Sequence, residues 1–151
     1  MKESVNKVPL LKKYINAVCE ILNIEAPSVS YDAEDFPEPS MLASCDSEGT
    51  TIYLRRGASF NMDLCLAVAH ELRHAWQIRS DKSFWLSSYK PRKKCSSLEE
   101  YNLQPAELDA NAFSCVVLNT LFGVNPLFQG LPESVRDEIY KRAKQIVKNN
   151  Q

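Results

Sequence analysis

The chain lacks several features that mark large classes of protein. Its 151 residues carry a formal net charge of −1, which argues against a partner bound mainly by nucleic-acid electrostatics. No apolar run reaches the length of a membrane span. The N-terminal stretch 1–7 leads into an amphipathic segment and not into a secretory signal. These absences favour a cytoplasmic protein without membrane or nucleic-acid partners.

The cysteines are too scattered to form a covalent framework. They stand at positions 19, 45, 65, 95 and 115, an odd count with no close pair. This spacing predicts neither a disulfide network nor a cysteine-rich zinc site, and it suits a reducing compartment. Internal repeats and low-complexity tracts are missing too. With 44% hydrophobic residues, the chain is expected to form one domain over residues 1–151 that buries roughly two-thirds of its unfolded surface.

Only two histidines are present, and both fall in the pentapeptide HELRH at residues 70–74. On a helix this spacing places His70 and His74 on one face, where both imidazoles can bind one zinc ion. Glu71 then lies beside the metal and can accept a proton from water. The alternatives are a solvated polar stripe or a pair of hydrogen-bonded core histidines. Apolar residues flank the motif and argue against both, because they indicate the wall of a partly buried cleft.

A catalytic zinc site needs a third protein ligand and one open position. Pro105 favours the start of a helix, and Glu107 and Asn111 then share one face of that helix. Glu107 can complete a site of two histidines and one glutamate. Asn111 can hydrogen-bond the ring nitrogen of a ligand histidine that does not bind the metal. Taken alone, Glu107 is more commonly a first-turn acid that the helix dipole favours.

Following the HExxH motif, the run ELDANAF at residues 107–113 resembles the second motif of gluzincin metallopeptidases, particularly the ImmA/IrrE-like group. The resemblance extends over most of residues 8–147. It implies that Glu107 binds zinc and that Asn111 supports the site. Asp109 and Ser114 stand where Glu and Ala are frequent in the family. The usual continuation after HExxH and a helix-turn-helix segment are both missing.

The remaining pattern predicts an α+β fold of the minimal zincin type. Helices are expected at residues 8–24, 61–79, 105–118 and 132–148, and Asn61 or Ser59 is expected to cap the helix that carries the histidines. Three short strands are expected at residues 29–31, 41–45 and 50–55. The predicted order is an N-terminal helix, a small, mostly antiparallel sheet, the zinc helix, the glutamate helix and a C-terminal helix.

Two further segments have open interpretations. The strand Thr51–Arg55 is a candidate edge to which an extended peptide could add, or it is simply a sheet edge kept soluble by Arg55 and Arg56. Residues 80–103 are expected to form a long loop. Its basic cluster Lys90–Lys94 could attract an acidic substrate or nucleic acid, although a solvated surface loop is the simpler interpretation. Its aromatic residues are expected to pack the loop onto the domain.

The function expected from these motifs is zinc-dependent hydrolysis of peptide bonds in a peptide or protein substrate. His70, His74 and Glu107 would hold the zinc ion, and Glu71 would be the general base. Tyr101 and Tyr89 are candidates for stabilising the oxyanion.

Two other interpretations of the motifs stay open. One is a zinc-binding regulatory or interaction protein with weak turnover, of phage or mobile-element origin. Glu71 argues against it, because structural zinc needs no general base. The other is a helical domain without metal, which requires two matching motifs to coincide by chance.

Overall fold

A three-stranded sheet and a set of helices make up residues 2–34, 36 and 38–149, which are the residues described by the computed structural model. In chain order the elements are α1 (Lys2–Leu22), β1 (Ser28–Ala33), β2 (Ala43–Cys45), β3 (Thr51–Arg55), α2 (Met62–Ser80), α3 (Lys82–Ser88), the 3-10 helix η1 (Arg92–Lys94), α4 (Leu98–Leu103), α5 (Pro105–Phe122) and α6 (Glu133–Asn149). The predicted α+β class is confirmed, and the four long helices lie close to their expected positions.

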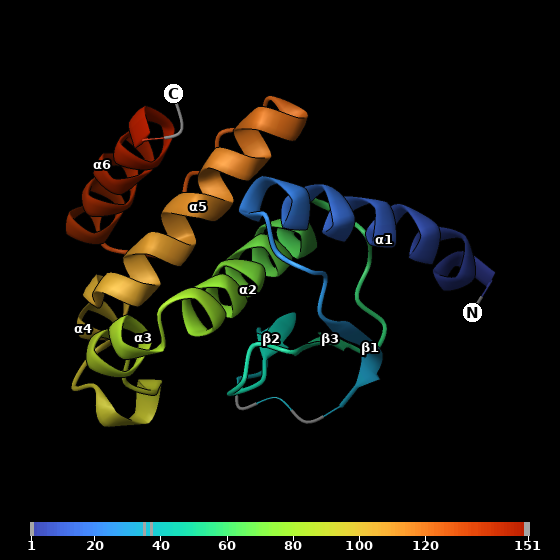
Figure 1. Cartoon of the computed structure of the whole chain (residues 1–151), viewed down its shortest axis with the longest axis horizontal. Coiled ribbons are helices and arrows are strands. Elements are labelled where there is room, and N and C mark those ends of the chain that lie inside the picture. Colours follow the sequence, from blue (N-terminus) through green and yellow to red (C-terminus); the bar gives the residue numbers. More distant parts are fainter. Residues whose placement is uncertain (1, 35, 37, 150–151) are drawn as a thin grey trace.

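Helix α2, which carries the HExxH motif, lies between the sheet and α5 (Figure 1). Asn61 caps it, because the Asn61 side chain accepts a hydrogen bond from the backbone N–H of Leu64 at 2.9 Å. At the other end, the N–H of Asp81 donates to the carbonyl of Gln77 at 2.9 Å. The apolar face expected from the sequence is buried at Leu64, Cys65, Val68, Ala69, Leu72 and Ala75, and partly buried at Trp76.

One hydrophobic cluster joins α1, the sheet, α2, α5 and α6. Ile52 of β3, Leu72 of α2 and Phe113 of α5 are almost fully buried in it. This shared core fixes α2 and α5, the two helices that carry the candidate ligands, relative to each other. Among the described helices, none combines the length and the apolar character that crossing a membrane requires.

The sheet is mixed. β2 pairs antiparallel with β3, whereas β1 pairs parallel with β3, in the order β1-β3-β2. The prediction that Thr51–Arg55 is an edge strand is therefore wrong, because β3 is paired on both sides. The alternation of buried Ile52 and Leu54 with exposed Tyr53 shows which face is covered but not how many strands are neighbours. The sheet edge that packs beside α2 is β2.

The turn between β2 and β3 lies directly on α2. Asp46 shapes the turn by accepting hydrogen bonds from the backbone N–H of Thr50 at 2.8 Å and of Thr51 at 3.2 Å. Gly49 has φ +71°, and a Cβ atom at this position would lie 3.0 Å from the carbonyl oxygen of Ala75 in α2. Glycine is required here by both the backbone conformation and the close approach. The contact brings β2 to the part of α2 that carries the motif.

Residues 80–103 do not form the structureless loop expected from the sequence. They fold into α3, η1 and α4, which lie near the C-terminal end of α2 (Figure 1). The side chain of Asp81 caps α3 by accepting from Phe84 N, and that of Ser97 caps α4 by accepting from Glu100 N, both at 3.0 Å. These helices are too short to show a hydrophobic period, so the pattern of apolar residues could not reveal them.

Candidate metal site

His70 and His74 of α2 meet Glu107 of α5 at one point. The Nε2 atoms of the two histidines are 3.0 Å apart. Glu107 Oε2 lies 3.1 Å from His70 Nε2, and Glu107 Oε1 lies 2.9 Å from His74 Nε2. The i, i+4 spacing on α2 and the position of Glu107 in the first turn of α5 produce this convergence. The ligand atoms all lie within 4.8 Å of one another, so the group could hold a metal ion.

Each histidine directs its other ring nitrogen at an amide oxygen. His70 Nδ1 lies 2.7 Å from Asn111 Oδ1, and His74 Nδ1 lies 2.8 Å from Gln77 Oε1. An amide oxygen only accepts, so in the neutral ring Nδ1 carries the proton and Nε2 offers its lone pair toward the ligand group. The structure places Asn111 against His70. Gln77 was not predicted as a site residue, although its position three residues after His74 puts both on one helix face.

Burial and neighbouring charges shift the pKa values of His70 and Glu107 in opposite directions. Burial lowers the pKa of His70, but the Glu107 carboxylate outweighs this effect and raises that pKa from 6.5 to about 9. Burial raises the pKa of Glu107, yet the charges of His70 and His74 bring it well below its ordinary value. A proton held between these groups at neutral pH occupies the position a cation would take, so metal binding has to displace it.

Glu71 connects the ligand group to the sheet. The backbone N–H of Cys45 in β2 lies near enough to its carboxylate to lower the pKa of Glu71 slightly. Burial raises the pKa of Glu71 above its ordinary value, and the nearby His70 and His74 oppose that rise. A carboxylate whose pKa is shifted toward neutrality is suited to accept a proton and return it.

Aromatic side chains from the segment between α2 and α5 cover His74. Trp85 and Tyr89 stack with their ring centroids 4.3 Å apart, and these centroids lie 5.0 Å and 6.0 Å from that of His74. The hydroxyl of Tyr101 donates to Glu107 Oε1 at 3.1 Å. Burial and the charge of Glu107 raise the pKa of Tyr101, so this hydroxyl stays protonated. Tyr101 therefore orients a candidate ligand in this structure.

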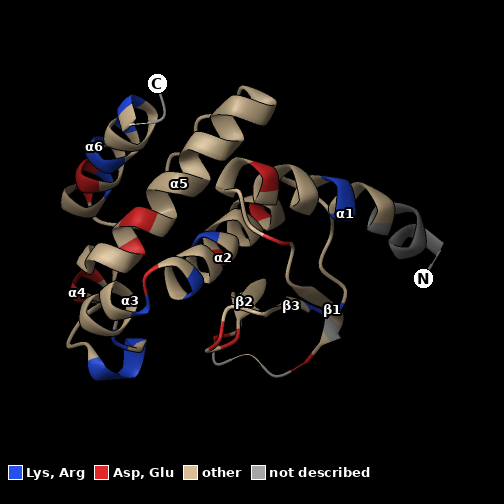
Figure 2. Ribbon diagram, viewed as in Figure 1, with Lys and Arg blue, Asp and Glu red and all other residues tan. Residues whose placement is uncertain are grey.

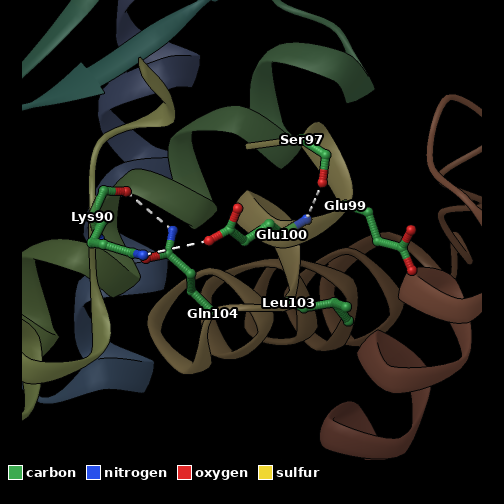
Figure 3. A pocket seen from close by; sticks show the side chains of 6 residues that line it. All are labelled: Lys90, Ser97, Glu99, Glu100, Leu103 and Gln104. Atoms are coloured by element: carbon green, nitrogen blue, oxygen red, sulfur yellow. Dashed lines mark hydrogen bonds and ion pairs between the residues drawn. The ribbon is translucent and has the colours of Figure 1, made fainter. Parts of the chain in front are cut away.

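Gln104, which directly precedes α5, hydrogen-bonds to the segment that carries Trp85 and Tyr89. Its side-chain oxygen accepts from Lys90 N at 2.6 Å, and its side-chain nitrogen donates to Lys90 O at 3.1 Å, as Figure 3 shows. Lys90 directly follows Tyr89, so these two hydrogen bonds also help to hold Tyr89 in place. The hollow drawn in Figure 3 is lined by Lys90, Ser97, Glu99, Glu100, Leu103 and Gln104. None of the candidate metal ligands is among them. We therefore interpret this hollow as the place where the segment around Lys90 packs against α4 and Gln104, and not as part of the candidate metal site.

Charged residues of opposite sign gather on two sides of this region. The basic cluster Lys90–Lys94 lies on the surface beyond α3, whereas acidic residues lie on the turn between β2 and β3 (Figure 2). An ion pair at 3.2 Å between Lys82 and Glu48 joins α3 to that turn. Exposed pairs of this kind contribute little to stability.

Comparison of the chain with protein-family models, with curated protein sequences and with solved structures finds no match. The geometry alone therefore defines the class of the molecule. It is an α+β protein in which two histidines of one helix and a glutamate of another could hold a metal ion.

Proposed function

We propose that this chain is a zinc-dependent metallopeptidase of the gluzincin type. His70, His74 and Glu107 bind the ion, and Glu71 is the general base. The observation that carries the proposal is the convergence of two imidazole nitrogens and one carboxylate within 4.8 Å, with a second carboxylate on the residue next to His70. Two histidines and one glutamate are a known ligand set of catalytic zinc sites that keep one position open.

The donor atoms favour a transition metal such as zinc over calcium and magnesium. Calcium and magnesium prefer oxygen ligands, whereas imidazole nitrogen suits zinc. The outer hydrogen bonds support the same assignment, because metal-ligating histidines normally donate their other N–H to an oxygen. Asn111 does this for His70 and Gln77 does it for His74.

Zinc, when bound, polarises the scissile carbonyl and makes water a stronger nucleophile at neutral pH. Glu71 accepts the proton of the water whose oxygen attacks the carbonyl carbon. The same carboxyl group then gives this proton to the nitrogen of the leaving amine as the C–N bond breaks. The raised pKa of Glu71 favours this return step near neutral pH.

The outer edge of β2 offers a place for an extended peptide. Leu42 O and Asp46 N bond to β3, and alternate residues of an antiparallel pair direct their main-chain groups away from the partner. Ala43 and Cys45 therefore direct theirs to the free edge. Because Cys45 N–H lies near Glu71, a peptide that adds to β2 by main-chain hydrogen bonds passes beside the general base.

The first test replaces the general base. In Glu71→Gln the three ligands remain, so zinc stays bound, but the amide cannot accept the proton and hydrolysis falls by about 10²- to 10⁴-fold. The measurement is cleavage of a mixed fluorogenic peptide library, with metal content determined on the same samples. Glu138→Gln, which changes an exposed glutamate of α6, is the matched control and keeps full activity.

Two outcomes of this test contradict the proposal in different ways. Undiminished cleavage by Glu71→Gln means that another group is the base. A parent chain that binds zinc but cleaves no peptide in the library favours the alternative of a zinc-binding regulatory or interaction protein.

A further inference from the structure

A buried polar network leads from His74 away from the candidate metal site. Gln77, which is 1% exposed, accepts a hydrogen bond from His74 Nδ1 through its Oε1 atom at 2.8 Å. Its Nε2 atom donates to Ala106 O at 3.0 Å and to Asp109 Oδ2 at 2.9 Å. Gln77 therefore joins a candidate ligand on α2 to the first turns of α5.

The partners of Gln77 leave only one orientation for its amide group. Ala106 O is a backbone carbonyl and Asp109 is a carboxylate, and both only accept hydrogen bonds. Rotating the amide by half a turn would set Oε1 against two oxygens. Oε1 therefore faces His74, which puts the proton of the neutral ring on Nδ1 and leaves Nε2 free for a cation.

Asp109 is held in turn by arginines from two helices. Arg73 of α2 donates to Asp109 Oδ2 at 2.7 Å and to Oδ1 at 3.1 Å. Arg142 of α6 donates to Oδ1 at 3.0 Å and 2.8 Å. Asp109 itself is 4% exposed, so its paired contacts with the buried Arg73 are sheltered from water and are stronger than surface ion pairs, whereas the Arg142 side chain is 36% exposed. Arg73 bonds the same Oδ2 atom that receives Gln77, and Arg142 orients the carboxylate through its other oxygen, Oδ1.

We propose that Gln77 is a positioning residue of the metal site, and that the Asp109–Arg142 ion pair ties metal affinity to helix α6. This inference rests on the proposed function, because it needs zinc at His70, His74 and Glu107. Helix α6 supplies no candidate ligand and lies on the far side of α5 from α2 (Figure 1), yet a change in α6 weakens metal binding.

The direct test is Gln77→Met, which keeps the length of the side chain and removes its acceptor and donors. Zinc affinity measured by chelator competition falls about 10- to 100-fold, and the visible absorption bands of the cobalt-substituted protein shift because His74 is no longer held. Tyr14→Phe is the matched control. It removes another buried hydrogen bond of α2, from Tyr14 Oη to Cys65 O at 2.6 Å, so it lowers stability but changes neither zinc affinity nor the cobalt spectrum.

A second variant keeps the inference testable if Gln77→Met does not fold. Arg142→Met leaves Arg73 on Asp109, so its loss of zinc affinity is smaller, roughly 3- to 10-fold. Lys144→Met, which changes an exposed residue of the same helix, has the affinity of the parent. If Gln77→Met or Arg142→Met binds zinc as tightly as the parent, with an unchanged cobalt spectrum, the inference is overturned and the proposed function stands. A parent chain that binds no metal overturns both.

Discussion

At the residue scale, both candidate histidine ligands depend on side-chain amides that fix which ring nitrogen carries the proton. Asn111 does this from α5, one helical turn after Glu107, so one face of α5 supplies both a candidate ligand and a hydrogen-bond partner for His70. Gln77 does it for His74 from the same helix as the histidine. The two imidazoles thus reach the same tautomer, with the proton on Nδ1, by separate hydrogen bonds.

The contribution of Asn111 can be measured on its own. Asn111→Ala removes the acceptor of His70 Nδ1, so His70 loses its fixed tautomer and zinc affinity falls by about 10- to 100-fold. Zinc titration against a chelator is the measurement. Asn119→Ala is the control, since Asn119 is an exposed residue of the same helix whose amide bonds to Asn125 at 2.7 Å, and it keeps the parent affinity. Equal affinities for Asn111→Ala and the parent would exclude a supporting role for Asn111.

At the element scale, the turn between β2 and β3 decides how closely the sheet approaches α2. The left-handed backbone of Gly49 and its contact with Ala75 O leave no room for a side chain. This turn therefore helps to hold Cys45 N–H at the Glu71 carboxylate.

Gly49→Ala accordingly lowers the free energy of unfolding. The left-handed conformation alone costs about 1–2 kcal/mol for a residue with a Cβ atom, and the approach to Ala75 O adds to this cost. Urea unfolding of the purified protein is the measurement. Gly130→Ala is the control, because a Cβ atom there meets nothing within 4 Å. If Gly49→Ala costs no more stability than Gly130→Ala, the turn does not need glycine.

The sequence predicted the long helices because hydrophobic residues repeat in them at the helical period and because Asn61 and Pro105 mark helix starts. Strand order could not be predicted in the same way. The short hairpin turn predicted the pairing of β2 with β3, but the parallel pairing of β1 with β3 depends on where the chain returns after residue 33. Such a return leaves no periodic signal in the sequence.

In the candidate site too, the features within one helix could be predicted from the sequence, whereas the contacts between helices could not. His70, Glu71 and His74 follow from spacing within one helix, and Glu107 and Asn111 follow from spacing within another. The network through Gln77, Asp109 and Arg142 joins three helices. Spacing within a single helix carries no information about such contacts, so only the packing of α2, α5 and α6 reveals them.

At the scale of the whole molecule, the candidate ligands make the stability of the fold depend on pH. In the metal-free protein the pKa of His70 is raised from 6.5 to about 9, chiefly because the Glu107 charge outweighs burial. The stabilisation from protonated His70 is therefore fully present below pH 6.5 and is lost as the pH rises through about 9. The pKa of Glu107 is lowered from 4.5, so its contribution is present above pH 4.5 and is lost as the pH falls below it.

Melting temperatures of the chelator-treated protein should therefore decline on the alkaline side, and zinc should suppress this decline because the cation replaces the proton. Glu107→Gln is the comparison variant, in which the metal-free decline is much reduced because the charge that raises the pKa of His70 is gone. A metal-free parent with the same alkaline profile as Glu107→Gln would show that the two residues do not interact as the structure indicates.

Elemental analysis of the purified chain tests the proposal that His70, His74 and Glu107 hold zinc. We expect about one zinc per chain, retained through gel filtration and lost when His70 and His74 are both replaced by alanine. A parent chain without any transition metal, or a double variant that keeps its zinc, would contradict it.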